Sequence, residues 1–429
     1  MFLFRHLTEI YNGGFIVFFF KIKRLFYFFY LIPLLIIGFI IVIFFRLLSP
    51  IIIIRIGQLY SSRLGHFGTN TELYLCEIDN NINKPNQKYI DLFYFSDSII
   101  CNTQLALMWK RILYVYPRWL LHPLYLINNI LPGSKKFQTG QTLQQDRDIC
   151  NLTDSSKIHL NFTAVEEEKG KEELFKMGIP YGSKFVCLNV RDSAYLNNVM
   201  PGDWSYHNYR DANVDNYYEG IEKLINSGYY VLRMGSIVKK RANFFHRKFI
   251  DYASDGFRTD FMDIYLGAKC DFCISNGTGF DSIPFIFKRP ILIVNCAPIG
   301  YISTFMNKCI YIFKHYINEN GIKLNLSQLD QLELLFSTDG NKISEKRCKV
   351  LENNPLEIKE AVVEMIERVK NNNWSSRSNN KNNQDLFWKN FPLDRLDSIG
   401  VKLHGEVRVL IAQNFLNNNK YIIGELYGK

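Results

Sequence analysis

The stretch RTDFMDIYLGAKCDFCISNGTGFDSIPFIFKRPILIVN, residues 258–295, alternates helical and extended sequence patterns. Thr259 or Asp260 is placed to cap the first helix, and the short apolar runs that follow are typical of buried strands. The predicted order is a helix, a strand, a turn, a short helix and a second strand, at residues 261–268, 271–276, 277–279, 280–287 and 289–295. Strands that alternate with helices predict a parallel, doubly wound α/β sheet.

The same alternation continues on both sides of this stretch. KFVCLNVRD, residues 184–192, is a buried strand that ends in Arg-Asp, and a helix and a strand are predicted at 216–227 and 229–235. Asn354-Pro355 suits the start of a helix that runs to Lys370 with one apolar face. Near the beginning, the β-branched run 51–54 predicts a strand, which Arg55 and Gly57 follow. The next stretch, SSRLGHFGTNTE, residues 61–72, is interpreted as a glycine-containing loop that leads into a helix.

These elements predict two Rossmann-like domains of ordinary size in a chain of 429 residues. Residues 371–385 are rich in Asn and Ser and are interpreted as a linker, whereas the apolar pairs at 387–388 and 415–416 are expected to dock again. The predicted parts are a membrane anchor, an N-terminal Rossmann-like domain, a C-terminal Rossmann-like domain, and a linker with a return segment, at residues 1–48, 49–178, 179–370 and 371–429.

The composition excludes several classes of protein. Hydrophobic residues make up 47% of the chain and aromatic residues 15%, which excludes a disordered protein. No basic repeat or RNA-binding signature accompanies the net charge of +10, so we expect no nucleic-acid partner. The nine cysteines form no framework, which favours a reducing compartment. Cys270 and Cys273 have the spacing of half a zinc site without a second pair, and we interpret them as buried strand cysteines.

A membrane segment is predicted near the N-terminus. No charged residue occurs from Leu25 to Phe45, and a helix of that length would measure about 30 Å, enough to cross a bilayer. Basic residues flank the run and no cleavage site follows it, which indicates an uncleaved anchor. The basic cluster ahead of it favours a crossing, whereas a break at Pro33 and Gly38 would let the segment return to the same leaflet. We expect the second, monotopic arrangement.

A second stretch also has the composition of a membrane interface. MWKRILYVYPRWLLHPLYLINNIL, residues 108–131, mixes Trp, Tyr and Leu with basic residues. Pro117 and Pro123 interrupt any single amphipathic face, so an ordinary helix packed inside the first domain is the alternative.

Glycines and basic residues follow the predicted strands, where parallel α/β folds bind ligands. Arg191 follows one strand, Arg233 and Gly235 lie in RMG at the end of another, and Gly277-Thr278-Gly279 precedes a helix N-terminus that favours phosphate. Sugar transfer from a nucleoside diphosphate needs cations or amides on the leaving group, and a base for the acceptor hydroxyl. Metal-dependent versions use a short Asp-Xaa-Asp turn. We expect the chain to lack this turn and to use neither metal nor cofactor.

Several segments resemble a bacterial family of glycosyltransferases found in surface-polysaccharide clusters. They are RLGHFGTNTE, LNVRDSAY, HNYRDANVDNY, RMG, residues 258–295 and the closing FLNNN. The likeness covers nearly everything from residue 51 onward. The second half is also similar to the fucosyltransferase-like branch of two-Rossmann-domain (GT-B) enzymes, in which a His-Xaa-Arg strand end places an arginine on the β-phosphate of a GDP-sugar. Asn189 stands in place of that histidine, and Arg191 keeps the arginine.

This resemblance implies a donor site in the second domain and an acceptor loop in the first. The expected donor-binding residues, several with ion-pair, loop or capping roles as alternatives, are Arg191, Asp192, His207, Asn208, Arg210, Arg233, Gly235, Ser275, Asn276, Gly277, Thr278, Gly279 and Asp281. Arg63, Gly65 and Asn70 are expected in the acceptor-side loop, with His66 and Glu72 as the catalytic candidates. His66 is the preferred base because an imidazole titrates near neutral pH, and a structural histidine is the alternative.

The leading hypothesis is a glycosyltransferase that moves a sugar from a nucleotide-sugar to a glycan or lipid-linked acceptor in surface-polysaccharide synthesis. A lipid-linked acceptor and membrane lipid as a partner would explain the anchor at residues 25–45. Nucleotide chemistry then requires the domains on the cytoplasmic face of the bacterial inner membrane. The alternatives are a pyruvyl- or phospho-group transferase acting on the same glycans, and a catalytically inactive, membrane-bound nucleotide-binding scaffold.

Overall fold

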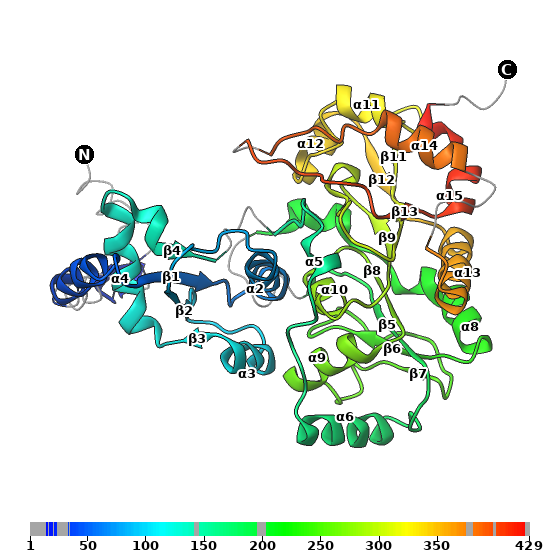
Figure 1. Ribbon diagram of the computed structural model, residues 1–429. Helices are drawn as coiled ribbons and strands as arrows, with labels where there is room; N and C mark the ends of the chain where they lie inside the picture. Colours follow the sequence, from blue (N-terminus) through cyan, green and yellow to red (C-terminus); the bar gives the residue numbers. More distant parts are fainter. Residues whose placement is uncertain are drawn as a thin grey trace. The chain divides into compact units, whose positions relative to one another are not determined.

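The computed structural model describes most of the chain as two compact units (Figure 1). The described residues are 14–15, 17–19, 21–23, 33, 35–140, 146–194, 203–374, 381–397 and 400–424. Unit 1 comprises residues 1–60, 83–98 and 109–140, and unit 2 comprises residues 61–82, 99–108 and 141–429. Residues 61–82, expected in the first domain, thus belong to unit 2. The predicted boundaries at 178 and 370 stay predictions.

Unit 1 contains a parallel sheet with the strand order β3-β2-β1-β4. Its strands are β1 (Ile53–Leu59), β2 (Tyr89–Phe95), β3 (Tyr114–Val115) and β4 (Gln138–Thr139). The first strand was expected at 51–54 with Arg55 and Gly57 beyond it, and this is wrong. Arg55 stays inside β1 because its guanidinium makes two hydrogen bonds of 2.6 Å to Asp91 on β2. Gly57 also lies inside β1, where its lack of a side chain leaves room for the Phe93 ring; a Cβ there would lie 2.7 Å from that ring.

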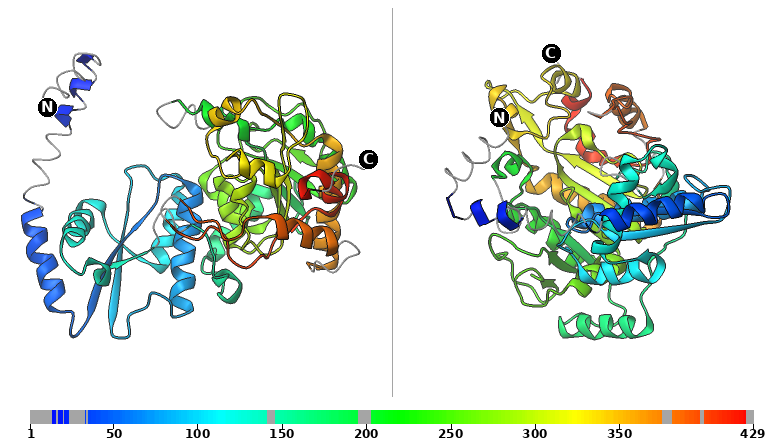
Figure 2. Two further views of the ribbon diagram at one scale, coloured as in Figure 1. Left: turned by 90° about the horizontal axis from the view of Figure 1, so that it is seen from above. Right: turned by 90° about the vertical axis from the view of Figure 1, so that its left-hand side faces the viewer.

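Two helical segments pack on each other in unit 1, as the left view of Figure 2 also shows. Residues 35–47 are helical, and α4 spans Arg118–Ile130, with Pro123 inside it. A Cβ at Gly38 would lie 2.8 Å from Ile127, so the glycine permits the close approach. Val42 is buried in a cluster with Ile56 and Leu124. The stretch 108–131 therefore divides into the end of α3 (Thr103–Ile112), β3 and α4.

No helix within the described ranges combines the length and apolar character needed to cross a membrane. The predicted anchor at 25–45 falls partly outside these ranges, because residues 25–32 and 34 are not among them.

Unit 2 contains a parallel sheet with the strand order β13-β10-β9-β8-β5-β6-β7 (Figure 1). Its strands are β5 (Phe185–Asn189), β6 (Tyr230–Met234), β7 (Phe249–Ile250), β8 (Phe272–Ser275), β9 (Ile291–Cys296), β10 (Cys309–Phe313) and β13 (Leu410–Ile411). Counted along the chain, this is the Rossmann order 3-2-1-4-5-6 with one further strand. The prediction of a parallel α/β fold is confirmed.

Helices cover both faces of this sheet (Figure 1). On one side α8 (Tyr218–Asn226) packs on α13 (Pro355–Asn371), where a Cβ at Gly220 would lie 3.3 Å from Val362. On the other side lie α9 (Asp260–Lys269), α10 (Ser282–Ile286) and α2 (Leu64–Asp79).

The remaining elements of the two units are η1 (Ser134–Phe137), α5 (Leu152–Ser155), α6 (Ala164–Lys176), η2 (Ser205–Arg210), η3 (Val214–Tyr217), η4 (Gly279–Asp281), η5 (Ile299–Tyr301), β11 (His315–Ile317), α11 (Leu326–Gln331), α12 (Gly340–Glu345), β12 (Lys349–Leu351), α14 (Lys381–Asn390), α15 (Gln413–Asn418) and η6 (Lys420–Ile423).

The predicted helix caps are confirmed. Thr259 accepts a hydrogen bond of 3.1 Å from the backbone N–H of Met262, and so caps α9. Asn354 and Glu357 form a capping box at the start of α13, with Pro355 in its first turn. Each cap supplies acceptors for backbone N–H groups that have no partner within the helix.

The C-terminal return segment docks on unit 2, as predicted. Phe387 is fully buried and stacks on Phe313 with the ring planes 7° apart. Phe415 and Leu416 are also buried. The predicted linker at 371–385 is too long, because α14 already begins at Lys381 to bring Phe387 onto the core.

All nine cysteines are free thiols. Cys270 and Cys273 are both fully buried, as predicted, but only Cys273 lies in a strand, β8, because Cys270 is the residue that ends α9.

Candidate functional site

The carboxyl ends of β5 and β8 lie side by side in unit 2, at the point where the strand order reverses. Asn189 of β5 is in register with Ser275 of β8. From β5 the sheet continues to β6 and β7 on one side, and from β8 to β9 and β10 on the other. Doubly wound sheets bind ligands outside the carboxyl ends of the strands at this switch point. The topology thus brings the residues after β5, beginning with Arg191, next to the turn after β8.

Side chains of β5 and η4 hold the turn Gly277-Thr278-Gly279. Asp281 Oδ2 accepts a hydrogen bond of 2.7 Å from the Thr278 N–H, as part of a capping box at η4. Asn189 Nδ2 donates to Thr278 Oγ1 at 2.5 Å. Burial raises the pKa of Asp281 to about 6. Asp281 therefore has the capping role that was the alternative to sugar contact, and Gly277 supplies the positive φ of 73° that the turn requires.

Asn276 connects the two strand ends. Its Oδ1 accepts the backbone N–H of Arg191 at 3.0 Å, and its Nδ2 donates to the Tyr217 hydroxyl at 2.7 Å and to the Val294 carbonyl at 2.8 Å. Ser275, like Asn276, is buried. These contacts shape the site from within the protein.

Two guanidinium groups meet at this edge of the sheet. Arg191 Nε lies 3.2 Å from Asp211 Oδ1, and Arg210 Nη2 donates to the Gly277 carbonyl at 2.8 Å. Burial lowers the pKa of Arg191, and the charge of Arg210 lowers it further, so the two cations are close enough to repel. Among the described residues, Arg210 Nε is buried without a hydrogen-bond partner. A bound anion would reduce the repulsion between the two arginines and would accept a hydrogen bond from the Nε of Arg210.

His207 belongs to the same group. It lies on η2, with its ring 5.9 Å from that of Trp204 and nearly parallel to it. Burial lowers the pKa of His207, and Arg210, Arg191 and Arg63 lower it further. His207 Nδ1 is buried and has no hydrogen-bond partner in the part of the chain that is described. Asn208, next to it, is exposed.

Lys314 is a residue of this edge that sequence reasoning missed. It directly follows β10, is 3% exposed, and donates from Nζ to the Asp211 carbonyl. Burial lowers its pKa to about 8, and Arg191 contributes to the shift. The available signal was a lysine immediately after the buried run CIYIF, much as Arg191 follows the end of its own strand.

Three predicted donor residues have other surroundings. Arg233 is 2% exposed, and its Nη1 forms a buried ion pair of 3.2 Å with Asp251 Oδ2. Gly235 makes a tight turn with φ 148°, where a Cβ would lie 2.7 Å from Val238. Asp192 accepts the backbone N–H groups of Ala194 and Lys239, both at 2.8 Å. Their donor roles stay predictions, but these contacts favour a structural role for Arg233.

The region 61–72 is not the loop that was expected. Arg63 is the N-cap residue of α2, and Gly65, His66, Asn70 and Glu72 all lie on that helix. The glycines serve close packing: a Cβ at Gly65 would lie 3.2 Å from the Gly279 Cα, and one at Gly68 would lie 2.7 Å from Ser282 Oγ. The first turn of α2 is therefore adjacent to the turn 277–279, within unit 2.

His66 lies on this first turn with polar neighbours. Its Nδ1 is 3.1 Å from Asn70 Oδ1 and 3.7 Å from Asp146 Oδ2. Asp146 begins Asp146-Arg147-Asp148, so the expectation that the chain lacks an Asp-Xaa-Asp sequence is wrong. The second aspartate is not available to a metal, because buried Asp148 accepts hydrogen bonds from the backbone of Leu152 and from both the backbone and the hydroxyl of Thr153.

Glu72 is buried on α2, with its Oε1 2.8 Å from His159 Nδ1. Burial raises the pKa of this carboxyl group. A general base must reach the proton that it removes, so this ion pair does not favour the predicted catalytic role. That role stays a prediction.

No protein-family model matches the sequence, and no curated protein sequence matches it. Similar solved structures include the ADP-heptose lipopolysaccharide heptosyltransferase II of E. coli, which is 13% identical; the match covers 73% of this chain and 100% of that chain, with a TM-score of 0.42. A family 9 glycosyl transferase from Veillonella parvula is 10% identical, with coverages of 75% and 98% and a TM-score of 0.42. The iron-containing glycosyltransferase TibC of enterotoxigenic E. coli is 10% identical, with coverages of 74% and 76% and a TM-score of 0.32. Likenesses this distant identify no family for the chain.

Proposed function

We propose that the chain is a glycosyltransferase whose nucleotide-sugar donor binds to unit 2, with its diphosphate against Arg191, His207 and Arg210. The observation that carries this proposal is that these three side chains converge at the switch point of a sheet with the Rossmann strand order. Each of them has one buried nitrogen without a hydrogen-bond partner among the described residues, although that of Arg191 forms an ion pair with Asp211. All three side chains can donate hydrogen bonds to phosphate oxygens.

The reaction that fits this site is transfer of the sugar to an acceptor hydroxyl, with the nucleoside diphosphate as leaving group. Arg191 and Arg210 would stabilise the charge that develops on the diphosphate, which is the role of cationic groups in such transfers. Their charge makes a divalent metal at the phosphates unnecessary. The acceptor that we propose is a glycan or a lipid-linked acceptor in the synthesis of a surface polysaccharide.

Titration with nucleotides tests the proposal directly. UDP, GDP, CMP and dTDP are compared by thermal shift and calorimetry, each with EDTA and with Mg²⁺. At least one diphosphate is expected to bind, with dissociation constants that agree within about twofold between the two conditions, because arginines rather than a metal hold the phosphates. Binding that appears only with Mg²⁺ would contradict metal independence. Absence of binding by every nucleotide would contradict the site, and binding without transfer of any sugar would favour an inactive scaffold.

Diphosphate affinity is expected to increase as the pH falls below neutrality, through His207. The free protein holds the pKa of His207 below 6.5, whereas a bound diphosphate would raise it. The complex then binds more protons than the free protein, so affinity rises as the pH falls between the two pKa values. Calorimetry from pH 5 to pH 8 measures this trend.

His207→Gln is the matched variant for the pH series. The titration of the nucleotide itself is common to both proteins, so the difference between their profiles reports on His207. Parallel profiles for the two proteins would remove His207 from the phosphate site.

We also propose that unit 1 attaches to the surface of the cytoplasmic membrane leaflet, on the basis of the face that helical residues 35–47 leave uncovered. One side of this helix packs on α4 through Gly38 and Val42. The large apolar side chains that it exposes are Ile36, Ile37, Phe39, Ile40, Phe44 and Leu47. Trp119 of α4 is also 58% exposed, next to Arg118. Apolar and aromatic side chains with basic neighbours suit a membrane interface.

Removing three of these side chains is expected to weaken vesicle binding. The combined variant Phe39→Ser, Phe44→Ser and Trp119→Ala should lower the partition coefficient on anionic vesicles by more than about 100-fold, because each of the three aromatic rings contributes at least about 1 kcal/mol and every 1.4 kcal/mol corresponds to a factor of ten. Sedimentation with vesicles measures it. Phe245→Ser is the control, since Phe245 is 84% exposed in unit 2. An equal loss of vesicle binding in Phe245→Ser would contradict the assignment of the membrane surface to unit 1. A reporter fused after Lys429 that proved to be periplasmic would contradict attachment on the cytoplasmic side.

A further inference from the structure

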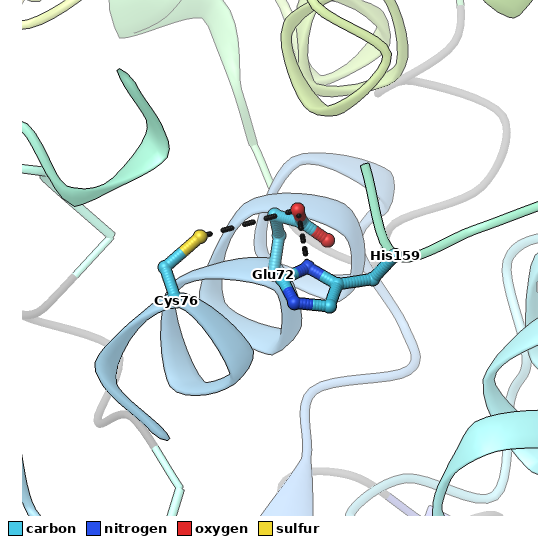
Figure 3. A group of neighbouring side chains, drawn as sticks. All are labelled: Glu72, Cys76 and His159. Carbon is cyan, nitrogen blue, oxygen red and sulfur yellow. Dashed lines mark hydrogen bonds and ion pairs between the residues drawn. The ribbon is translucent and has the colours of Figure 1, made fainter. Parts of the chain in front are cut away.

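A compact group of three potential metal ligands lies in unit 2 around the second half of α2 (Figure 3). Glu72 and Cys76 project from this helix one turn apart, and His159 comes from the segment between α5 and α6. One carboxylate oxygen, the thiol sulfur and one ring nitrogen all lie within 4.8 Å of one another. Oxygen, sulfur and imidazole nitrogen together are a ligand set that Zn²⁺ and related divalent ions accept.

One carboxylate oxygen of this group has no hydrogen-bond partner among the described residues. Glu72 is 3% exposed, and only its Oε1 meets His159. Its Oε2 is buried without a hydrogen-bond partner among the residues described. Among the described residues, the charge of Lys288 also acts on Glu72, and Lys288 Nζ donates to the Ser156 carbonyl. A buried carboxylate oxygen without a partner costs free energy, which a bound cation would offset.

The histidine is oriented as metal ligands usually are. His159 Nε2 lies 3.0 Å from Asp79 Oδ2, while Nδ1 faces Glu72. Metal-bound histidines commonly donate their second nitrogen to a carboxylate, which fixes the ring and its tautomer. Glu72, Cys76 and Asp79 follow the spacing i, i+4 and i+7, so one stripe of α2 supplies two ligands and the group that orients the third.

We propose that Glu72, Cys76 and His159 bind a divalent transition-metal ion of the zinc type, with Asp79 as the positioning residue for His159. Cys76 would bind as the thiolate and release its proton to solvent, and His159 would bind through neutral Nδ1. Three protein ligands leave a fourth position for water. The ion would fasten α2 to the segment before α6.

This site is separate from the proposed phosphate site. Glu72 lies seven residues after Gly65, which is about 10 Å along the helix from the turn that meets Gly279. The metal therefore has no part in holding the diphosphate. The inference stands whether or not the chain transfers sugars.

Cobalt substitution is the test, on the full chain purified without a histidine tag and stripped with chelator. The wild-type protein is expected to bind one equivalent of Co²⁺ and to show a thiolate-to-cobalt absorption band, with a melting temperature that rises as Co²⁺ or Zn²⁺ is added. Cys76→Ala should lose the band and the thermal shift. Cys150→Ser, which removes an exposed cysteine, should keep both.

Asp79→Asn provides a second measurement if Cys76→Ala does not fold. Asp79 is 34% exposed and is not a ligand, so its replacement should preserve the fold and weaken metal affinity roughly 10- to 100-fold. A wild-type protein without a thiolate band at millimolar Co²⁺ would overturn the site. A band that survives in Cys76→Ala would overturn it too, because the metal would then lie at another cysteine such as Cys270. Unchanged affinity in Asp79→Asn would contradict its positioning role.

Discussion

Replacing His66 by alanine is expected to lower the rate of sugar transfer roughly 10²- to 10⁴-fold, the usual contribution of a positioned general base. His66 lies on the first turn of α2, one residue after the glycine that packs on Gly279. Asn70 and Asp146 both face its Nδ1 and so orient the ring. An oriented imidazole beside the donor turn is placed to accept the proton of an acceptor hydroxyl.

For His66→Ala, kcat and nucleotide affinity are measured together, because a general base affects kcat and not the binding of the diphosphate. His66→Ala should leave the dissociation constant of the nucleoside diphosphate within about twofold of wild type, because the phosphates are assigned to Arg191, His207 and Arg210. Asp146→Asn should lower kcat by a smaller factor, since it changes only the orientation of the ring. His246→Ala is the control, because His246 is exposed elsewhere in unit 2. An unchanged kcat in His66→Ala would return His66 to a structural role.

Arg191→Ala is expected to weaken nucleoside diphosphate binding roughly 10- to 150-fold. A hydrogen bond to a charged group contributes about 1.5–3 kcal/mol, and every 1.4 kcal/mol corresponds to a factor of ten. Arg191→Lys should recover only part of the affinity, because a point charge does not reproduce the two-pronged contact of a guanidinium. Calorimetry with the nucleotide that binds best measures both variants.

Loss of an ion pair must be separated from loss of a phosphate contact. Arg191 also pairs with Asp211, so its removal leaves a carboxylate without its partner. The double variant Arg191→Ala and Asp211→Asn removes that carboxylate charge. We expect the double variant to melt closer to wild type but to bind the diphosphate as weakly as Arg191→Ala. Arg347→Ala, at an exposed surface pair, is the control for removing an arginine. Wild-type affinity in either Arg191 variant would contradict the assignment.

Local patterns were sufficient to predict several elements of unit 2. The cap of α9 by Thr259 and the capping box of α13 at Asn354 were readable because a cap and its N–H partners lie within a few residues. The buried strands β5, β8 and β9 were readable because a strand covered on both faces is a continuous apolar run.

Local patterns failed where packing between distant segments decides the conformation. The glycines at 65 and 68 suggested a loop, yet they lie inside α2, because Gly279 and Ser282 approach so closely that a side chain would not fit. Arg233 lies near the end of β6, as Arg191 lies just beyond β5, but Asp251 after the neighbouring strand β7 holds Arg233 in a buried ion pair. A strand end in the sequence does not reveal which carboxylate will lie beside it.

The sequence by itself determined that this chain builds a parallel α/β sheet with basic residues at its strand ends, because hydrophobic period, caps and turn residues act over a few neighbours. Only the tertiary structure decided which strand ends meet. Pairing of β5 with β8 joins Arg191 to the turn 277–279 across more than eighty residues, and β10 adds Lys314 to the same edge. The folding of α2 against the segment before α6 likewise brings His159 to Glu72 and Cys76. Contacts of such sequence separation depend on the order of strands and the packing of layers, and no local spacing encodes them.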